Sequence, residues 1–238
     1  MKLDILVFAA HPDDAELSCS GTIISQIDKG NKVGIVDLTR GELGTRGNSE
    51  LRAKEAEAAA ELMQLTAREN LRFADGFFEN DKAHLIEIIK VIRKYQPEIV
   101  LANAIDDRHP DHGHAASLVS RACFLSGLVK IETDLYGQSQ TGWRPKQVYH
   151  YIQDRHIKPD FVVDITSYWN KKIEVIKAFK SQFFDAESQE PLTYISSPDF
   201  LPFQEARAME MGHSIGVKYG EGFTKERQLG VKNLFDLF

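Results

Sequence analysis

Alternation between apolar strand patterns and helical patterns is the feature that most limits how this chain can fold. We expect strands at residues 3–10, 32–38, 70–73 and 98–102. The spacing of apolar residues predicts helices at residues 13–29, 49–65, 81–95 and 112–125. A strand that is apolar throughout is typical of a parallel sheet covered on both faces. The first half therefore predicts an α/β fold, a Rossmann-like and mostly parallel sheet with helices on both faces.

The second half of the chain is less regular. We expect strands at 147–152 and 161–165 and helices at 167–184 and 199–211. Residues 126–145 and 185–198 have no clear period and are candidate substrate loops. Because no repeat, linker or low-complexity tract divides the 238 residues, we expect one domain over 1–238. Residues 1–125 would be its Rossmann-like half, and residues 126–238 a C-terminal α+β lobe that is not independent.

Charge and cysteine content exclude several classes of partner and site. The net charge is −6 and there is no cationic run, so nucleic acid is not an expected partner. The two cysteines, Cys19 and Cys123, form no CxxC motif, which excludes a disulfide scaffold and a cysteine-rich zinc module. The N-terminal residues lack a signal-peptide pattern, and the apolar run at 3–10 is too short to span a bilayer. We expect a cytoplasmic protein without a membrane partner.

Two polar clusters follow the first and fourth expected strands. The first cluster contains His11, Asp13 and Asp14, and the second contains His109, Asp111 and His112. In the common doubly wound order these two strands are neighbours, and ligands bind in the crevice beyond their carboxyl ends. The fold would therefore bring the two clusters together at one edge of the sheet.

The residue types in these clusters suit metal-assisted hydrolysis. Two imidazoles and one carboxylate can hold Zn²⁺ and leave one position for water, although Fe²⁺ accepts the same ligand types. Such an ion polarises a carbonyl and lowers the pKa of bound water to roughly 7. A free carboxylate beside it can move a proton to a leaving amine, and a further histidine can stabilise an oxyanion.

Structural alternatives exist for both clusters. Asp13 could cap the first helix, with Glu16 three residues later completing a capping-box pattern. Asp14 would then only favour the helix dipole. Asp111 could cap the helix that follows it in the same way. The proximity of the two clusters at adjacent strand ends favours the metal-site interpretation.

The segment after the second strand has alternatives of its own. The glycine-rich loop at 41–47 lacks the dinucleotide fingerprint and a Walker lysine, so we interpret it as a mobile substrate loop, with a plain connecting loop as the alternative. Arg52 could pair with Glu55 on one helix face. It could also reach into the crevice and donate hydrogen bonds to a polyol or carboxylate.

Other functions fit parts of the pattern. A phosphoesterase would favour two metal ions about 3.5–4 Å apart and more carboxylates. A non-catalytic Rossmann-like module that binds a sugar or nucleotide would need neither a metal nor Asp13. A deacetylase of another sugar, such as a chitooligosaccharide, would use the same site.

The two clusters also resemble a known family. Ala10-His11-Pro12-Asp13-Asp14 and His109-Pro110-Asp111-His112 are similar to the paired motifs of LmbE-like (PIG-L) zinc-dependent N-deacetylases. The segments 39–47, 50–52, 180–183 and 219–223 resemble the bacillithiol-biosynthesis branch, which removes acetate from N-acetylglucosaminyl malate. Ser20-Gly21 departs from the pattern, because the family usually has a glycine pair there.

The resemblance implies a role for each site residue. It makes the ligands of one zinc ion per chain His11, Asp14 and His112. It makes Asp13 the general base and later the acid, His109 the group that stabilises the oxyanion, and Asp111 the group that orients His109. The substrate-binding residues would be Arg52 and Glu42. It also implies a sugar substrate and a homo-oligomer, possibly a hexamer.

Overall fold

Strands and helices alternate along the first half of the chain as the sequence predicts. The computed structural model describes residues 1–183 and 189–237. Its first eight elements are β1 (Ile5–Ala9), α1 (Asp14–Asp28), β2 (Val33–Thr39), α2 (Ser49–Met63), β3 (Ala67–Phe73), α3 (Lys82–Tyr95), β4 (Ile99–Ala102) and α4 (Pro110–Leu125). β3 begins earlier than expected, because Arg68 and Glu69 near its start are polar and only half-buried and therefore gave no apolar pattern.

The second half adds strands to the same sheet. Its elements are β5 (Asp134–Leu135), β6 (Gln138–Ser139), β7 (Gln147–Tyr151), β8 (Phe161–Asp164), α5 (Trp169–Ile176), α6 (Phe200–His213), β9 (Gly220–Lys225) and short 3₁₀ turns at Thr166–Tyr168 and Leu234–Asp236. The seven-stranded sheet has the order β3-β2-β1-β4-β7-β9-β8, and β9 is antiparallel to both of its neighbours. The helix expected at 167–184 ends as α5 at Ile176, and its predicted last residue, 184, lies outside the described residues.

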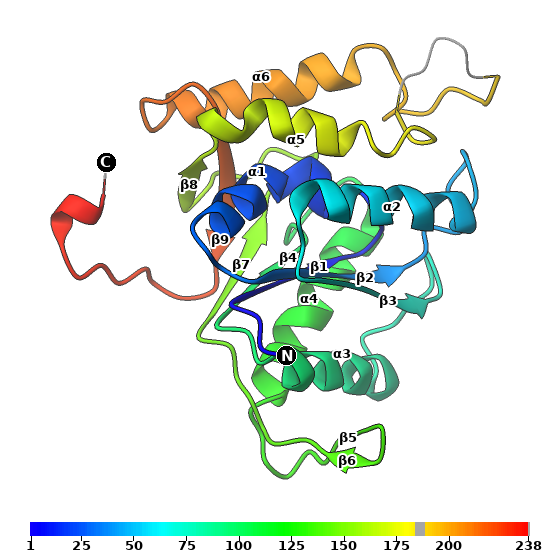
Figure 1. Cartoon of the computed structure of the whole chain (residues 1–238), viewed down its shortest axis with the longest axis vertical. Helices are drawn as coiled ribbons and strands as arrows, with labels where there is room; N and C mark the ends of the chain where they lie inside the picture. The colour runs from blue at the N-terminus through cyan, green and yellow to red at the C-terminus, as the bar shows by residue number, and fades with distance from the viewer. Residues whose placement is uncertain (184–188, 238) are drawn as a thin grey trace.

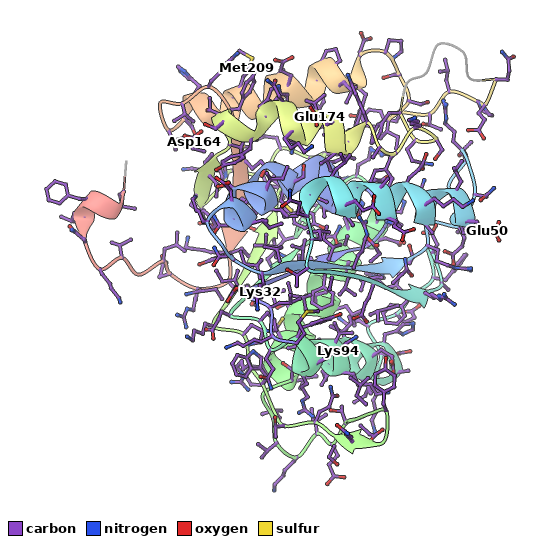
Figure 2. The ribbon with its side chains drawn as sticks, viewed as in Figure 1. Lys32, Glu50, Lys94, Asp164, Glu174 and Met209 are labelled. Carbon is purple, nitrogen blue, oxygen red and sulfur yellow. The ribbon has the colours of Figure 1, made fainter. Side chains whose placement is uncertain are left out.

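Helices cover both faces of the sheet (Figure 1), which confirms the predicted fold class. Helices α1, α2, α5 and α6 lie on one side, and α3 and α4 lie on the other. In Figure 2, Met209 marks the outer edge of the helix layer that contains α6, and Lys94 marks the helix layer on the opposite side of the sheet, which contains α3. The mostly parallel sheet is therefore the middle of three layers.

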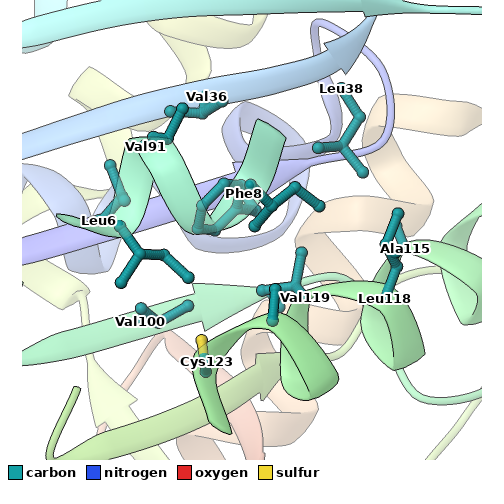
Figure 3. Packing of buried hydrophobic residues seen from close by; sticks show 14 of the residues in the cluster. Leu6, Phe8, Val36, Leu38, Val91, Val100, Ala115, Leu118, Val119 and Cys123 are labelled. Carbon is teal, nitrogen blue, oxygen red and sulfur yellow. The ribbon is translucent and has the colours of Figure 1, made fainter. Parts of the chain in front are cut away.

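Alternate residues of β1 supply the two halves of the core. Leu6 and Phe8 pack with residues of α3 and α4, in the cluster drawn in Figure 3. Ile5 and Val7 pack on the opposite face with residues of α1, α2 and α5. Because a strand alternates its side chains between two faces, a strand buried on both sides has to be apolar at every position.

The register of the sheet places the ends of β1 and β4 side by side. The two strands pair in parallel, with Ile5 opposite Ile99 and Val7 opposite Leu101. Both polar clusters therefore begin at the same edge of the sheet, as the strand order predicts. Within residues 1–183 and 189–237, no helix has the length and apolar character needed to cross a bilayer.

Strand β9 was not predicted, because two of its six residues are glycines that break the strand pattern. The glycines are needed for close packing. A Cβ atom on Gly220 would lie 2.5 Å from Val162 Cγ1 and 2.9 Å from the backbone nitrogen of Gly212 in α6. Strand β9 is therefore held directly under α6, which fixes its side chains against α1.

We expect Gly220→Ala to destabilise the protein, because the added methyl group would push α6 away from β9. The free energy of unfolding should fall by about 1–3 kcal/mol, as for other overpacked positions. Chemical denaturation would measure it. Gly230→Ala is the control, since a Cβ there meets no atom within 4 Å, and it should change the free energy by about 0.5 kcal/mol or less. Equal stability of the two variants would contradict this account of β9.

Candidate metal and catalytic site

The carboxyl ends of β1 and β4 bring two histidines and one carboxylate together. His11 follows β1, Asp14 is the first residue of α1, and His112 lies in the first turn of α4. His11 Nδ1 lies 3.5 Å from Asp14 Oδ2, and His112 Nε2 lies 3.0 Å from Asp14 Oδ1. All three side chains are buried, so their charges are poorly screened by water.

Carboxylates on the far side of each ring fix its orientation. His11 Nε2 lies 3.0 Å from Asp75 Oδ1 and 3.2 Å from Asp111 Oδ2. His112 Nδ1 lies 2.5 Å from Asp107 Oδ2. Since a carboxylate accepts hydrogen bonds, these contacts assign one proton to Nε2 of His11 and one to Nδ1 of His112. The other nitrogen of each ring faces Asp14.

This donor set fits a divalent metal ion. With the protons assigned in this way, His11 Nδ1 and His112 Nε2 direct lone pairs toward the two oxygens of Asp14. Lone pairs and a carboxylate at this spacing repel one another unless positive charge lies among them. Imidazole nitrogens whose opposite N–H is held by a carboxylate are typical zinc ligands.

Two sets of ligand atoms among the described residues lie within 4.8 Å of one another and could hold an ion. One set is His11, His109 and His112; the other is His11, Asp75 and Asp111. The set implied by the family resemblance differs from the first by having Asp14 in place of His109. Asp14 contacts both of the other rings directly and also accepts hydrogen bonds from Asn103 (3.0 Å) and Gln153 (3.1 Å).

The pKa values of His112 and Asp14 also show that this site favours positive charge beside the Asp14 carboxylate. Burial alone would lower the pKa of His112, but the charge of Asp14 and the hydrogen bond to Asp107 outweigh it and raise the pKa to about 9. Burial alone would raise the pKa of Asp14, but the charge of His112 and the hydrogen bond from His11 hold it well below its usual value. The negative charge of these carboxylates, which favours the protonated imidazole, would also favour a metal cation at the same position.

His109 and Asp111 interact differently from the predicted arrangement. Asp111 was expected to orient His109 with its carboxylate, but that carboxylate contacts His11 and accepts a hydrogen bond from the nitrogen of Gly76 (2.9 Å). His109 is instead held by the backbone, because its Nδ1 accepts a hydrogen bond from the Asp111 nitrogen (3.3 Å). His109, and not Asp111, is thus the N-cap of α4. The Asp111 carboxylate does not orient His109 because His11 and the Gly76 nitrogen already occupy it, and only the backbone nitrogen of Asp111 contacts the His109 ring.

Asp13 lies beside the predicted ligands in a strained backbone conformation. Its φ is 120° and its ψ is −23°, values that residues other than glycine rarely adopt. Its side chain makes no capping hydrogen bond to α1 among the described residues, and Glu16 binds Arg68 instead, so the capping-box alternative does not apply. Burial raises the pKa of Asp13 to about 7, against the lowering effect of Arg52 and with a contribution from Asp14.

The glycine-rich loop packs around Arg52. A Cβ atom on Gly41, whose φ is +63°, would overlap an Arg52 guanidinium nitrogen. Arg52 also donates a hydrogen bond to Gln182, whereas Glu55 accepts hydrogen bonds from the nitrogen and hydroxyl of Ser181 (both 2.7 Å). Arg52 and Glu55 therefore bind different partners, and the alternative in which they pair with each other does not apply. The guanidinium that lies against the loop backbone thus explains the glycines at 41 and 44.

A cavity of about 400 Å³ opens above these groups, a size that suits a small-molecule ligand. Its lining combines the two polar clusters, apart from Asp111, with Arg52, residues 43–46 of the glycine-rich loop and one side of α6. Glu42, a predicted substrate-binding residue, is not among the lining residues; it accepts hydrogen bonds from the nitrogens of Arg40 (3.1 Å) and Asp75 (3.2 Å). Glu42 therefore shapes the base of the loop.

Sequence reasoning missed four polar residues that contact the clusters. They are Asp75, Asn103, Asp107 and Gln153. Asp75 follows β3 closely and could have been found by the rule applied to β1 and β4, that polar groups at the carboxyl ends of strands converge. The same rule applies to Asn103, which directly follows β4, and to Gln153, which lies two residues after β7. Asp107 gave no comparable signal, because it lies farther along the loop after β4.

We expect Asp107→Asn to weaken metal binding, because the amide cannot match the carboxylate that holds the Nδ1–H of His112. The dissociation constant for Zn²⁺ should rise about 10- to 100-fold in a chelator competition assay. Asp106→Asn is the matched control, since Asp106 is exposed and pairs with Arg155 at the surface. Equal Zn²⁺ affinity of the two variants would exclude a role for Asp107 in ligand orientation.

Comparisons with known proteins agree with this geometry. The chain matches the model of the PIG-L family, described as GlcNAc-PI de-N-acetylase, over residues 6–123, which contain both polar clusters. Diacetylchitobiose deacetylase of Thermococcus kodakarensis is 29% identical over 233 residues, or 92% of this chain and 81% of that protein. The 4-oxalmesaconate hydratase of Pseudomonas putida is 28% identical over 192 residues, or 74% of this chain and 73% of that protein.

A solved structure extends the similarity to nearly the whole chain. The conserved protein TT1542 from Thermus thermophilus is 33% identical, with a TM-score of 0.84 over 97% of this chain and 98% of that one. With the family motifs at the ends of β1 and β4 and the fold shared throughout, the chain belongs to the PIG-L (LmbE-like) family.

Proposed function

We propose that this protein is a zinc-dependent N-deacetylase that hydrolyses the N-acetyl group of an N-acetylglucosamine conjugate. One observation carries the proposal: buried Asp13 lies in the same cavity as the converging donors of His11, Asp14 and His112. These three residues would hold the ion. A bound Zn²⁺ polarises a carbonyl and makes water more acidic.

Asp13 would act as the proton carrier. A general base works best when its pKa lies near the operating pH, and burial raises the pKa of Asp13 to about 7. As a carboxylate it would accept the proton of the attacking water, and it would then give that proton to the nitrogen of the leaving amine. The strained backbone at Asp13 supports this role, because such conformations cluster at functional sites.

His109 would stabilise the negative charge that develops on the acetyl oxygen. Its Nδ1 accepts a hydrogen bond from the backbone, so the ring proton is on Nε2 and can be donated. Burial, together with the charges of His11 and His112, lowers the pKa of His109 and so favours the neutral ring. A neutral imidazole donor aimed at the oxygen costs little reorganisation as the charge forms.

We propose N-acetylglucosaminyl malate, the substrate of the bacillithiol branch, as the conjugate. The resemblance of segments 39–47 and 50–52 to that branch supports this choice. Arg52 lies in the cavity wall and lowers the pKa of Asp13 through its charge, so it is close enough to the reacting end to bind an acidic aglycone. Diacetylchitobiose, the substrate named for the Thermococcus relative, lacks such a charge.

The first test is Asp13→Asn, which removes the base and keeps the shape of the side chain. With N-acetylglucosaminyl malate, we expect kcat to fall about 10²- to 10⁴-fold while bound zinc per chain stays unchanged. Amine release and elemental analysis would measure the two quantities. The control, Asp14→Asn, should lose both turnover and zinc. Near-normal turnover of zinc-loaded Asp13→Asn would overturn the assignment of the base.

The second test concerns the aglycone. We expect Arg52→Gln to lower kcat/KM for N-acetylglucosaminyl malate about 10- to 100-fold more than kcat/KM for diacetylchitobiose, because it removes a charge-assisted hydrogen bond. Steady-state kinetics with both substrates would give the ratio. The ratio separates recognition from loop anchoring, since loss of the Gln182 contact should affect both substrates alike. An unchanged ratio would assign Arg52 to the loop alone.

A further inference from the structure

Helix α1 is broken one turn after the residues that enter the site. Cys19 has φ −143° and ψ 15°, which are not helical values, and it is fully buried. In an unbroken helix the Gly21 nitrogen would donate to the Leu17 carbonyl. That break separates a first turn, which begins at Asp14, from the rest of α1. Kinks of this kind arise where a side chain enters the hydrogen-bond ladder.

A buried ion pair fills the break. Lys172 of α5 donates to the Leu17 carbonyl at 2.7 Å, and Glu221 of β9 accepts from the Gly21 nitrogen at 3.0 Å. The two charged groups contact each other at 2.6 Å. The donor and acceptor that would have bonded within the helix are therefore each bound to one member of the pair. Glu221 also accepts from the nitrogen of Thr22 at 2.7 Å.

The surroundings hold the pair in a fixed position. Both side chains are at most 4% exposed, and both residues line the inner wall of the cavity. Glu221 lies between Gly220 and Gly222, at which a Cβ would meet α6 backbone at 2.9 Å and Met211 Sδ at 3.0 Å. Helix α5 packs along α1, as Figure 1 shows. The pair therefore joins α1 to two elements of the second half of the chain.

We propose that Lys172 and Glu221 are positioning residues that keep α1 broken and so hold its first turn, with Asp13 and Asp14, in register with His112. Without the pair, the Gly21 nitrogen and the Leu17 carbonyl can bond to each other. The first turn would then become continuous with the rest of α1, and the Asp14 carboxylate would move away from the imidazoles of His11 and His112. This inference rests on the proposed function for its catalytic consequence, but its effect on metal binding is independent of the substrate.

The test uses the double variant Lys172→Met/Glu221→Gln, which removes both charges and leaves none unpaired in the interior. Removing one partner alone would leave a buried charge and could prevent folding. We expect the double variant to fold, to bind Zn²⁺ about 10- to 100-fold more weakly, and to lose about 100-fold in kcat with a smaller change in KM. Chelator competition and steady-state kinetics would measure these effects.

Two further variants keep the outcome decisive. Tyr168→Phe removes a hydrogen bond from the Tyr168 hydroxyl to Asp28 (2.8 Å) at the far end of α1, and it should leave Zn²⁺ affinity unchanged. The second variant, Lys172→Met/Glu221→Ala, also leaves no buried charge, but it lacks the side-chain oxygen with which the glutamine could accept from the Thr22 nitrogen, so it should bind Zn²⁺ still more weakly than Lys172→Met/Glu221→Gln. A folded Lys172→Met/Glu221→Gln protein with normal Zn²⁺ affinity and kcat would overturn the proposal, as would equal Zn²⁺ affinities of these two double variants.

These results remain separable from the proposed function. If the wild-type protein binds Zn²⁺ but releases no acetate, the deacetylase assignment fails and the affinity comparison still decides the role of the pair. If Asp13→Asn behaves as expected while the double variant keeps normal affinity, only the positioning role fails.

Discussion

A single carboxylate, Asp14, faces the imidazoles of two histidines that come from different strand ends, and this contact explains much of the surrounding structure. Asp14 lies 3.0 Å from His112 Nε2 and 3.5 Å from His11 Nδ1 in a buried site. Such an arrangement is stable only where positive charge is available and where each group is held against rotation. The outer carboxylates Asp75 and Asp107 supply that restraint on the rings.

Both halves of the chain contribute contacts to this arrangement. The parallel strands β1 and β4 fix the distance between the two clusters, because their register is set by a core that is apolar on both faces. The second half contributes Gln153, which donates to Asp14 (3.1 Å), and the ion pair that fills the break in α1. The contacts of the candidate site therefore extend to strand β9, which lies two places beyond β4 in the sheet.

The sequence predicts the parts of this fold that follow from strong periodic patterns, such as β1, β2, β4 and α3. The convergence of His11 and His112 followed from strand order alone. Strand β9 could not be predicted in this way, because close packing against α6 selects glycine there. The sequence also could not predict how individual side chains are oriented. The Asp111 carboxylate contacts His11 and not His109, and the Glu42 carboxylate accepts hydrogen bonds from backbone nitrogens. Spacing identifies which residues reach the crevice, whereas packing decides what each one does there.

Buried charged groups meet helix α1 from two neighbouring elements. Glu16 is fully buried and paired with Arg68, which also forms two hydrogen bonds to Asp37 at 2.9 and 3.0 Å. Buried ion pairs contribute little to stability compared with apolar packing of the same volume. Their value here is directional, because a charged pair has one favourable geometry, whereas apolar side chains tolerate sliding. With Arg68 contacting α1 from β3 and Lys172 contacting it from α5, the helix that carries Asp14 is restrained from two sides.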